Sequence, residues 1–184
     1  MEKIEVLVVG GDDSNHAASS PKYELNVATF STLYEDSIVE TFHNTRDYDL
    51  ARRWIEKQER DFRFAILTKE KYAHSSTNLV LVIPKIIHLY LNELDLSPEN
   101  LKVYLDGRIG RGNRDYIRNY FLGKRGIQRV TVDNFIKKNP GPHGETIKRP
   151  HCPPVVYYAD VLASMLLGLS GQELFTHKKA VLID

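Results

Sequence analysis

The sequence predicts an α/β protein with one mixed sheet and helices on both of its faces. Short apolar runs rich in β-branched residues alternate with longer segments whose apolar residues recur at helical spacing. Polar turns separate the first strands, as in an antiparallel meander, whereas helices separate the later strands, as in parallel crossovers. A chain of 184 residues is long enough for one core, so we expect a single domain over residues 1–184.

The first part of the chain is expected to supply the antiparallel strands and one helix. The expected strands are residues 4–9, 23–31 and 37–42. Gly10-Gly11 directly follows the first run, which predicts a tight turn there. Asp47 or Asp49 is expected to cap a helix that runs to about residue 58.

The rest of the chain alternates strands and helices. The expected strands are residues 62–67, 101–105 and 127–132, and the expected helices are residues 78–94, 114–122 and 155–167. Pro84 is expected to kink its helix or to fall near its first turn, and Ser97-Pro98 to end that element. Residues 137–154 are expected to form a loop, and residues 173–184 allow one more short strand.

Positive charge is concentrated in one part of the chain. Residues 107–149 hold eleven Lys or Arg against three acids, a net charge of +8 in a protein whose total is +1. Such asymmetry is typical of a surface that meets polyanions, although a charged run is also an ordinary solvated face. The block therefore allows nucleic acid as a partner.

Composition excludes several classes of protein. The one cysteine, Cys152, rules out an internal disulfide and a multi-cysteine zinc site, and it fits a reducing, cytoplasmic location. We expect no membrane association, because the longest apolar stretch, residues 79–91, is interrupted by Pro84, Lys85 and His88. Neither a P-loop nor a full dinucleotide fingerprint is present.

Aspartates at the ends of expected strands or near the start of an expected helix are the best indication of function. They are Asp12, Asp13, Asp106 and Asp160. Mg²⁺ and Mn²⁺ prefer carboxylate and water oxygens. Paired cations about 3.5–4 Å apart activate a water and neutralise the leaving oxygen in phosphodiester hydrolysis. The pattern predicts a metal-dependent nuclease with these four residues as catalytic metal ligands.

Each aspartate also has an ordinary structural explanation. Asp-Asp-Ser-Asn is good turn chemistry, Asp106-Gly107 is a common turn pair, and Asp160 fits as a plain helix residue. Asp12 and Asp13 point to opposite faces if the strand continues through them, but both can approach one site if a turn follows the glycine pair.

Three short segments resemble type 2 ribonuclease H, a family of the ribonuclease H-like superfamily. Gly11-Asp12-Asp13 looks like the opening Gly-x-Asp-Glu motif of that family. Residues 97–107 look like its Ser-Pro break followed by a strand that ends in Asp-Gly. Residues 148–164 are similar to its Lys-Ala-Asp, Pro-Val-Val and Ala-Ser-Ile stretch. The resemblance spans most of the chain in the correct order.

The chain departs from that family at three places. Its second acid is Asp13 instead of glutamate, and residues 14–16 replace the Gly-Arg-Gly that reads the ribonucleotide junction. Pro150 stands where the fourth acid is expected, whereas Asp160 lies later on the helix, which is similar to resolvases and type 1 ribonuclease H. The fold implied by the resemblance is therefore better supported than the substrate.

The resemblance implies a ribonuclease H-like domain whose first three strands are antiparallel. From the placement of the acids we expect Mg²⁺ or Mn²⁺ as cofactor, with Asp12 and Asp106 binding or bridging the metals and Asp160 and Asp13 completing the shell. The implied substrates are RNA–DNA hybrids or ribonucleotides in duplex DNA.

Basic residues near these acids are candidate contacts to the substrate backbone. They are His16, Arg108, Arg111, Arg114, Lys148 and Arg149. The glycines of residues 107–112 would let backbone amides approach an anion as well. An exposed turn histidine and a solvated arginine face are the alternatives.

Two other functions fit the same pattern. One is a non-catalytic module of this fold that binds nucleic acid or a protein, with the acids making turns. The other is a nuclease of the same superfamily that acts on DNA junctions or transposon ends.

Overall fold

The computed structural model describes residues 2–14, 23–44, 46–68, 78–107, 109–135, 150–181 and 183. The strands of the main sheet are β1 (Glu2–Ser14), β2 (Tyr23–Ser31), β4 (Arg60–Thr68), β5 (Leu96–Asp106), β6 (Arg129–Phe135) and β8 (Ala180–Val181). A second, small sheet pairs β3 (Glu40–Thr41) with β7 (His151–Cys152). The helices are α1 (Tyr48–Ile55), α2 (Asn78–Glu93), α3 (Arg111–Arg125), α4 (Pro154–Leu166) and α5 (Gly171–Phe175), with a 3-10 turn η1 (Tyr34–Ser37).

The main sheet has the mixed topology that the sequence predicts. Its strand order is β6-β5-β1-β2-β4-β8. β2 pairs antiparallel with β1 on one side and with β4 on the other. β5 pairs parallel with β1, and β6 pairs parallel with β5. β8 runs parallel to β4 and confirms a short strand in the tail. This six-stranded arrangement confirms the mixed α/β fold class that the sequence predicts.

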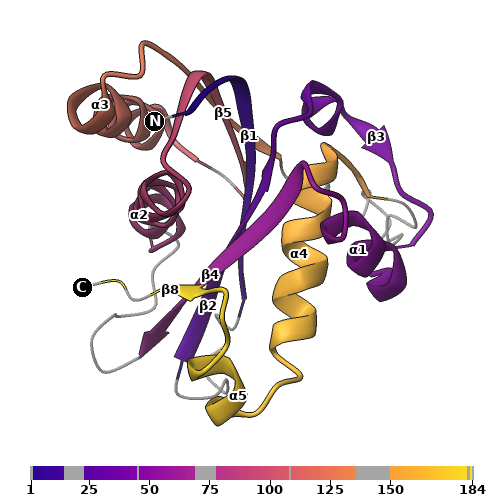
Figure 1. Cartoon of the computed structure of the whole chain (residues 1–184). Helices are drawn as coiled ribbons and strands as arrows, with labels where there is room; N and C mark the ends of the chain where they lie inside the picture. Colours follow the sequence, from indigo (N-terminus) through magenta and orange to yellow (C-terminus); the bar gives the residue numbers. More distant parts are fainter. Residues whose placement is uncertain are drawn as a thin grey trace.

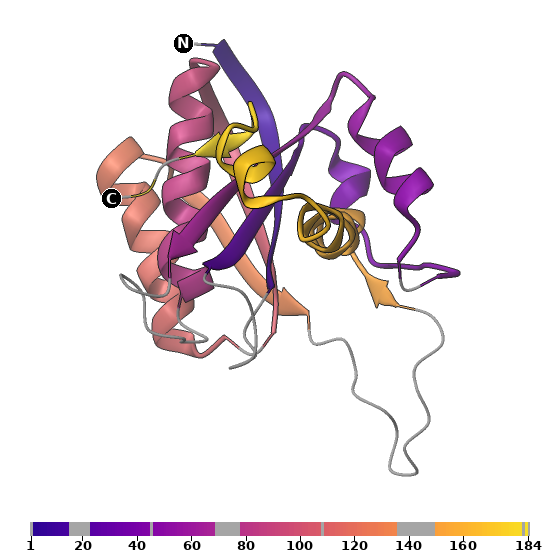
Figure 2. The same cartoon turned by 90° about the horizontal axis from the view of Figure 1, so that it is seen from below.

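Helices cover both faces of the sheet, as Figures 1 and 2 show, with α2 and α3 on one face and α4 and α1 on the other. The pleat divides the strand residues between two cores. In β1, Leu7 and Val9 pack under α2 and α3, whereas Val8 packs under α4. In β5, Leu105 belongs to the first core and Tyr104 to the second.

The expected turn at Gly10-Gly11 is wrong, because β1 continues to Ser14. Both glycines are needed for close packing. A Cβ on Gly10 would lie 2.1 Å from the carbonyl oxygen of Val155 in α4, and a Cβ on Gly11 would lie 2.5 Å from the Leu105 side chain. The hydroxyl of Thr29 in β2 donates to the same Val155 carbonyl at 2.7 Å.

The third antiparallel strand is β4, and the expected strand at residues 37–42 is wrong. Of that segment, Ser37 belongs to η1, and only Glu40–Thr41 forms a strand, β3, which is part of the small sheet. Ile38 is 54% exposed, so its apolar side chain does not mark a sheet face. Asp36, which is 2% exposed, fixes η1 by accepting hydrogen bonds from Ser31 at 2.5 Å and from Arg60 at 2.7 Å.

The later elements lie close to their expected places. α2 has Pro84 in its interior, and α3 and α4 differ from the expected bounds by a few residues. The expected break at Ser97-Pro98 is wrong, because β5 already begins at Leu96. The chain reverses instead at Asp95, whose φ of 52° lies in the left-handed region.

Candidate functional site

Asp12 and Asp106 lie side by side at the carboxyl ends of neighbouring parallel strands. Gly11 of β1 pairs with Leu105 of β5, and each aspartate is the next residue of its strand. Asp12 follows Gly10 by two residues and Asp106 follows Tyr104 by two, so both side chains are on the α4 face. Adjacent strands are about 4.8 Å apart, so the two carboxylates are neighbours. Asp12 is 5% exposed and Asp106 is half-buried.

Asp13 is on the other face of the sheet. Because β1 is extended through this point, consecutive side chains alternate between faces. Asp13 pairs with Asn26 of β2, whose side chain donates to the buried carboxylate of Glu24 at 3.1 Å. Asn78, the first residue of α2, donates to Glu24 at 3.3 Å. The structure therefore separates the two adjacent aspartates, one on the α4 face and one on the α2 face.

Asp160 is on α4 at about the height of Asp12. Figure 1 shows α4 running alongside β1. Val155 lies over Gly10, and the second half of α4 packs on Val27, the partner of Asp12 in β2. Asp160 follows Val155 by five helical residues, a rise of about 7.5 Å along α4. Asp12 follows Gly10 by two strand residues, a rise of about 6.6 Å along β1, so the two aspartates lie at a similar height. Asp160 is half-buried, and its helix placement agrees with expectation.

The Asp12–Asp106 pair has the donor chemistry that Mg²⁺ or Mn²⁺ needs. Among the described residues, no group of three or more His, Cys, Asp or Glu side chains is arranged to hold a metal ion. Mg²⁺ is usually bound by one or two carboxylates together with waters and substrate phosphates, and not by an all-protein cage. The residues present thus fit a cation held by two carboxylates and completed by a phosphate.

Arg114 supports the turn that follows Asp106. Its guanidinium donates to the Asn134 side chain at 2.7 Å, and the Asn134 amide donates to the Gly107 carbonyl at 2.9 Å. Gly107 has a φ of 99°, which favours glycine at this turn. Asn134 pairs with Leu105, so Arg114 reaches this edge from the α3 side of the sheet.

Sequence reasoning missed Asn134 as part of this edge. The available signal was a polar residue near the end of an apolar strand, the same signal that selected Asp106.

Arg111 lies at the surface of α3. Its side chain is 96% exposed and 3.8 Å from Asp115, a pair that contributes little in water. The remaining four candidate contacts lie outside the described residues. They are His16, Arg108, Lys148 and Arg149.

The tyrosines nearest the pair stay protonated at neutral pH. Burial raises the pKa of Tyr104, which precedes Asp106 on the same face, and the neighbouring Asp133 charge raises it further against a hydrogen bond with Ser37. Burial also raises the pKa of Tyr157 in α4. Neither phenol is therefore a base for this site at neutral pH.

Comparison with known proteins gives little beyond this geometry. No model of a protein family matches the chain, and no curated protein matches it. Among solved structures, the chain is similar to one in the structure of the PCNA:RNase HII complex from Archaeoglobus fulgidus. The identity is 11%, the match covers 86% of this chain and 71% of that chain, and the TM-score is 0.43. A likeness this distant carries no argument about activity, so the fold assignment rests on the sheet topology. None of the helices in the described part of the chain has the length and apolar content that a bilayer crossing requires.

Proposed function

We propose that this protein is a divalent-metal-dependent nuclease that hydrolyses phosphodiester bonds in nucleic acid. The observation that carries the proposal is the pairing of Asp12 and Asp106 on one face, at the carboxyl ends of adjacent parallel strands. Open α/β sheets bind ligands at this edge. Asp12 is buried, and its carboxylate accepts a hydrogen bond from the Asp13 backbone N–H at 2.8 Å.

The candidate aspartates would have different roles in the proposed site. Asp12 and Asp106 would hold Mg²⁺ or Mn²⁺ between them, and Asp160 would approach from α4 on the same face. When bound, such a cation supplies an activated water and neutralises charge on the phosphate oxygens. Asp13 faces α2, so we leave it out of this shell. The close α4–β1 contact at Gly10 would keep Asp160 in place.

The charge of α3 supports nucleic acid as the substrate. α3 carries five Lys or Arg residues and one acid, and it begins five residues after Asp106. Its N-terminal cap is Gly110, and an anion at a helix N-terminus accepts hydrogen bonds from amides of the first turn. Arg111 would contact a phosphate from the surface, and Arg114 would hold the Gly107 turn. RNA–DNA hybrids and ribonucleotide-containing duplexes are the proposed substrates.

Cleavage assays with paired variants test the proposal. We expect Mn²⁺-dependent cleavage of a labelled RNA–DNA hybrid or of a duplex with one ribonucleotide. The double variant Asp12→Asn, Asp106→Asn should lose at least about 100-fold in rate, because both carboxylates contact the reacting centre. Asp49→Asn on α1, 81% exposed, is the matched control and should retain the wild-type rate. Full activity of the double variant would disprove the assignment.

A non-catalytic nucleic-acid-binding module is the second candidate. It is favoured by the positive charge of α3, which has five Lys or Arg residues and one acid and would attract nucleic acid without a metal. Binding of the same duplexes without cleavage, at a strength unchanged by the Asp12 and Asp106 substitutions, would select it.

A further inference from the structure

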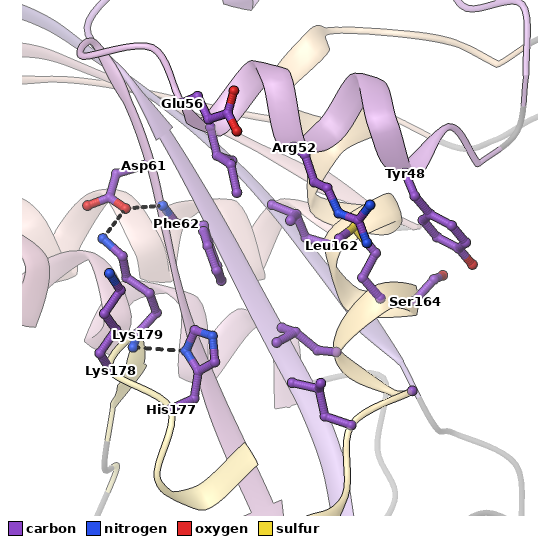
Figure 3. Close-up of a pocket in the computed structure, with 15 residues that line it drawn as sticks. Tyr48, Arg52, Glu56, Asp61, Phe62, Leu162, Ser164, His177, Lys178 and Lys179 are labelled. Carbon is purple, nitrogen blue, oxygen red and sulfur yellow. Dashed lines mark hydrogen bonds and ion pairs between the residues drawn. The ribbon is translucent and has the colours of Figure 1, made fainter. Parts of the chain in front are cut away.

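A cleft of about 760 Å³ lies between α1, α4, the start of β4 and the segment after α5. Figure 3 shows the residues that line it. Its wall is mostly apolar, and the apolar lining residues are Ile55, Phe62, Leu162, Met165, Leu166 and Leu169. None of the four candidate aspartates lines it, so it is separate from the proposed catalytic edge.

Within the described part of the chain, two cations on the rim of the cleft have no close, buried ion pair. Arg52 extends from α1 toward α4, as Figure 3 shows, and its described partner is Asp49 at 3.3 Å. Both side chains of that pair are mostly exposed, so the pair is weak and exchangeable. Lys178 is the second cation and is exposed. Glu56, one helical turn after Arg52, also lines the cleft, so the rim carries an acid as well as these cations.

Asp61, an acid that lines the cleft at the start of β4, is already paired with cations. Asp61 accepts from Lys179 at 2.6 Å and from Arg63 at 2.6 Å. Lys179 and Asp61 thus compensate each other, and Arg63 is itself paired with Glu93 at 2.9 Å. The cleft therefore combines an apolar floor with a rim that holds the weakly paired Arg52.

His177 adds a neutral polar group to this wall. Its ring lies edge-on to Phe64 with centroids 5.4 Å apart. Burial lowers the pKa of His177, and the Lys178 and Lys179 charges lower it further. The Lys178 and Lys179 charges that lower the pKa of His177 are charges that a bound anion would compensate.

We propose that this cleft binds a small amphipathic anion. Its apolar body would lie on the floor formed by β4 and α4, and its single carboxylate, sulfonate or phosphate group would lie against Arg52, whereas Lys178 lies on the other side of the cleft. The volume is within the range of small-molecule pockets, about 300–1,000 Å³. An apolar wall with a few convergent polar groups is the usual make-up of such sites.

Two dyes of the same shape and different charge test this proposal. The sulfonate 8-anilinonaphthalene-1-sulfonate is the anionic probe, and N-phenyl-1-naphthylamine is its uncharged counterpart. We expect the native protein to bind the sulfonate saturably, and octanoate to displace it. Near-UV circular dichroism of each sample confirms that binding is to the folded state, because the sulfonate also stains molten globules.

Variants of the lining residues then distinguish the contribution of charge to dye binding from the contribution of the shape of the cleft. Arg52→Glu should weaken sulfonate binding by about tenfold or more and leave the uncharged dye within about twofold. Arg53→Glu is exposed on the same helix but does not line the cleft, so it should change neither dye. Ser164→Trp should weaken both dyes by filling the cleft.

Three results would overturn the proposal. One is an equal effect of Arg52→Glu and Arg53→Glu on the sulfonate. Another is binding of the uncharged dye as tightly as the sulfonate. The third is displacement of the sulfonate by an acidic peptide at lower concentration than by octanoate, which would assign the cleft to a protein partner.

Discussion

The contact between Gly10 and α4 gives the most direct test of how the fold builds the candidate site. In the variant Gly10→Ala, the new Cβ would lie 2.1 Å from the Val155 carbonyl oxygen and 2.2 Å from its carbonyl carbon. Real Cβ contacts are not closer than 3.0 Å, so the backbone of α4 must move away by at least about 0.9 Å. Neither backbone atom can rotate aside, as a flexible side chain could.

The cost follows from what α4 buries. Ten of its thirteen residues are buried, so a displacement disturbs the whole interface between α4 and the sheet. Overpacking a core by one methyl-sized group costs about 1–3 kcal/mol. Weakening the hydrogen bond from Thr29 to Val155 adds about 1 kcal/mol. We expect a loss of about 3 kcal/mol in the free energy of unfolding. In a chain of this length, that loss lowers the Tm by about 6–12 °C.

Urea and thermal unfolding of two glycine variants measure this effect. Gly112→Ala is the matched control, because a Cβ there meets nothing within 4 Å and the residue is helical in α3. It should stabilise the protein by up to about 1 kcal/mol. A Gly10→Ala protein that melts within about 1 °C of the wild type would refute the close α4–β1 packing. If Asp160 acts with the Asp12–Asp106 pair, Gly10→Ala should also slow cleavage below the melting range.

Three further changes test other contacts. Thr29→Val should cost about 1–3 kcal/mol in urea unfolding, because it removes the hydroxyl that donates to Val155 at 2.7 Å; an unchanged midpoint would contradict that role. Asp36→Ala should cost about 3–5 kcal/mol by leaving the buried Arg60 unpaired, and adding Arg60→Met should recover part of the loss; fully additive losses would argue against the pairing. Burial, then the nearby lysines, lowers the pKa of His177, so its contribution to stability is complete above the unfolded pKa of about 6.5 and is lost as pH falls below it. His177→Gln should therefore flatten the fall in Tm between neutral and mildly acidic pH, and an unchanged slope would exclude His177 as its source.

The sequence was sufficient for the fold class because hydrophobic periodicity is a local signal. Every long helix and every long strand of the main sheet overlaps an expected element, and the antiparallel-then-parallel order is confirmed. The errors have long-range causes. A glycine pair signals a turn as readily as a close approach, and only the partner helix shows that Gly10 is the second kind. Residues 37–42 look like a strand, but the Asp36–Arg60 pair, 24 residues apart, holds a 3-10 turn before them.

The candidate site was predictable in part. The placement of Asp106 at the carboxyl end of β5 agrees with expectation, as does that of Asp160 on α4. The separation of Asp12 from Asp13 depended on whether the strand continued, which one sequence leaves open. The link from Arg114 through Asn134 to Gly107 joins residues of α3, β6 and the β5 turn, and no spacing in the sequence predicts it.

The most direct test of the central proposal is the position of Mn²⁺ in crystals of the protein soaked with the metal and a short hybrid duplex. Anomalous scattering locates Mn²⁺ independently of activity. The proposal predicts a peak between the carboxylates of Asp12 and Asp106, at about 2.1–2.2 Å from an oxygen of each. The peak should vanish in the double Asp→Asn variant. Absence of a peak in wild-type crystals, with the duplex bound and the two side chains turned apart, would contradict it.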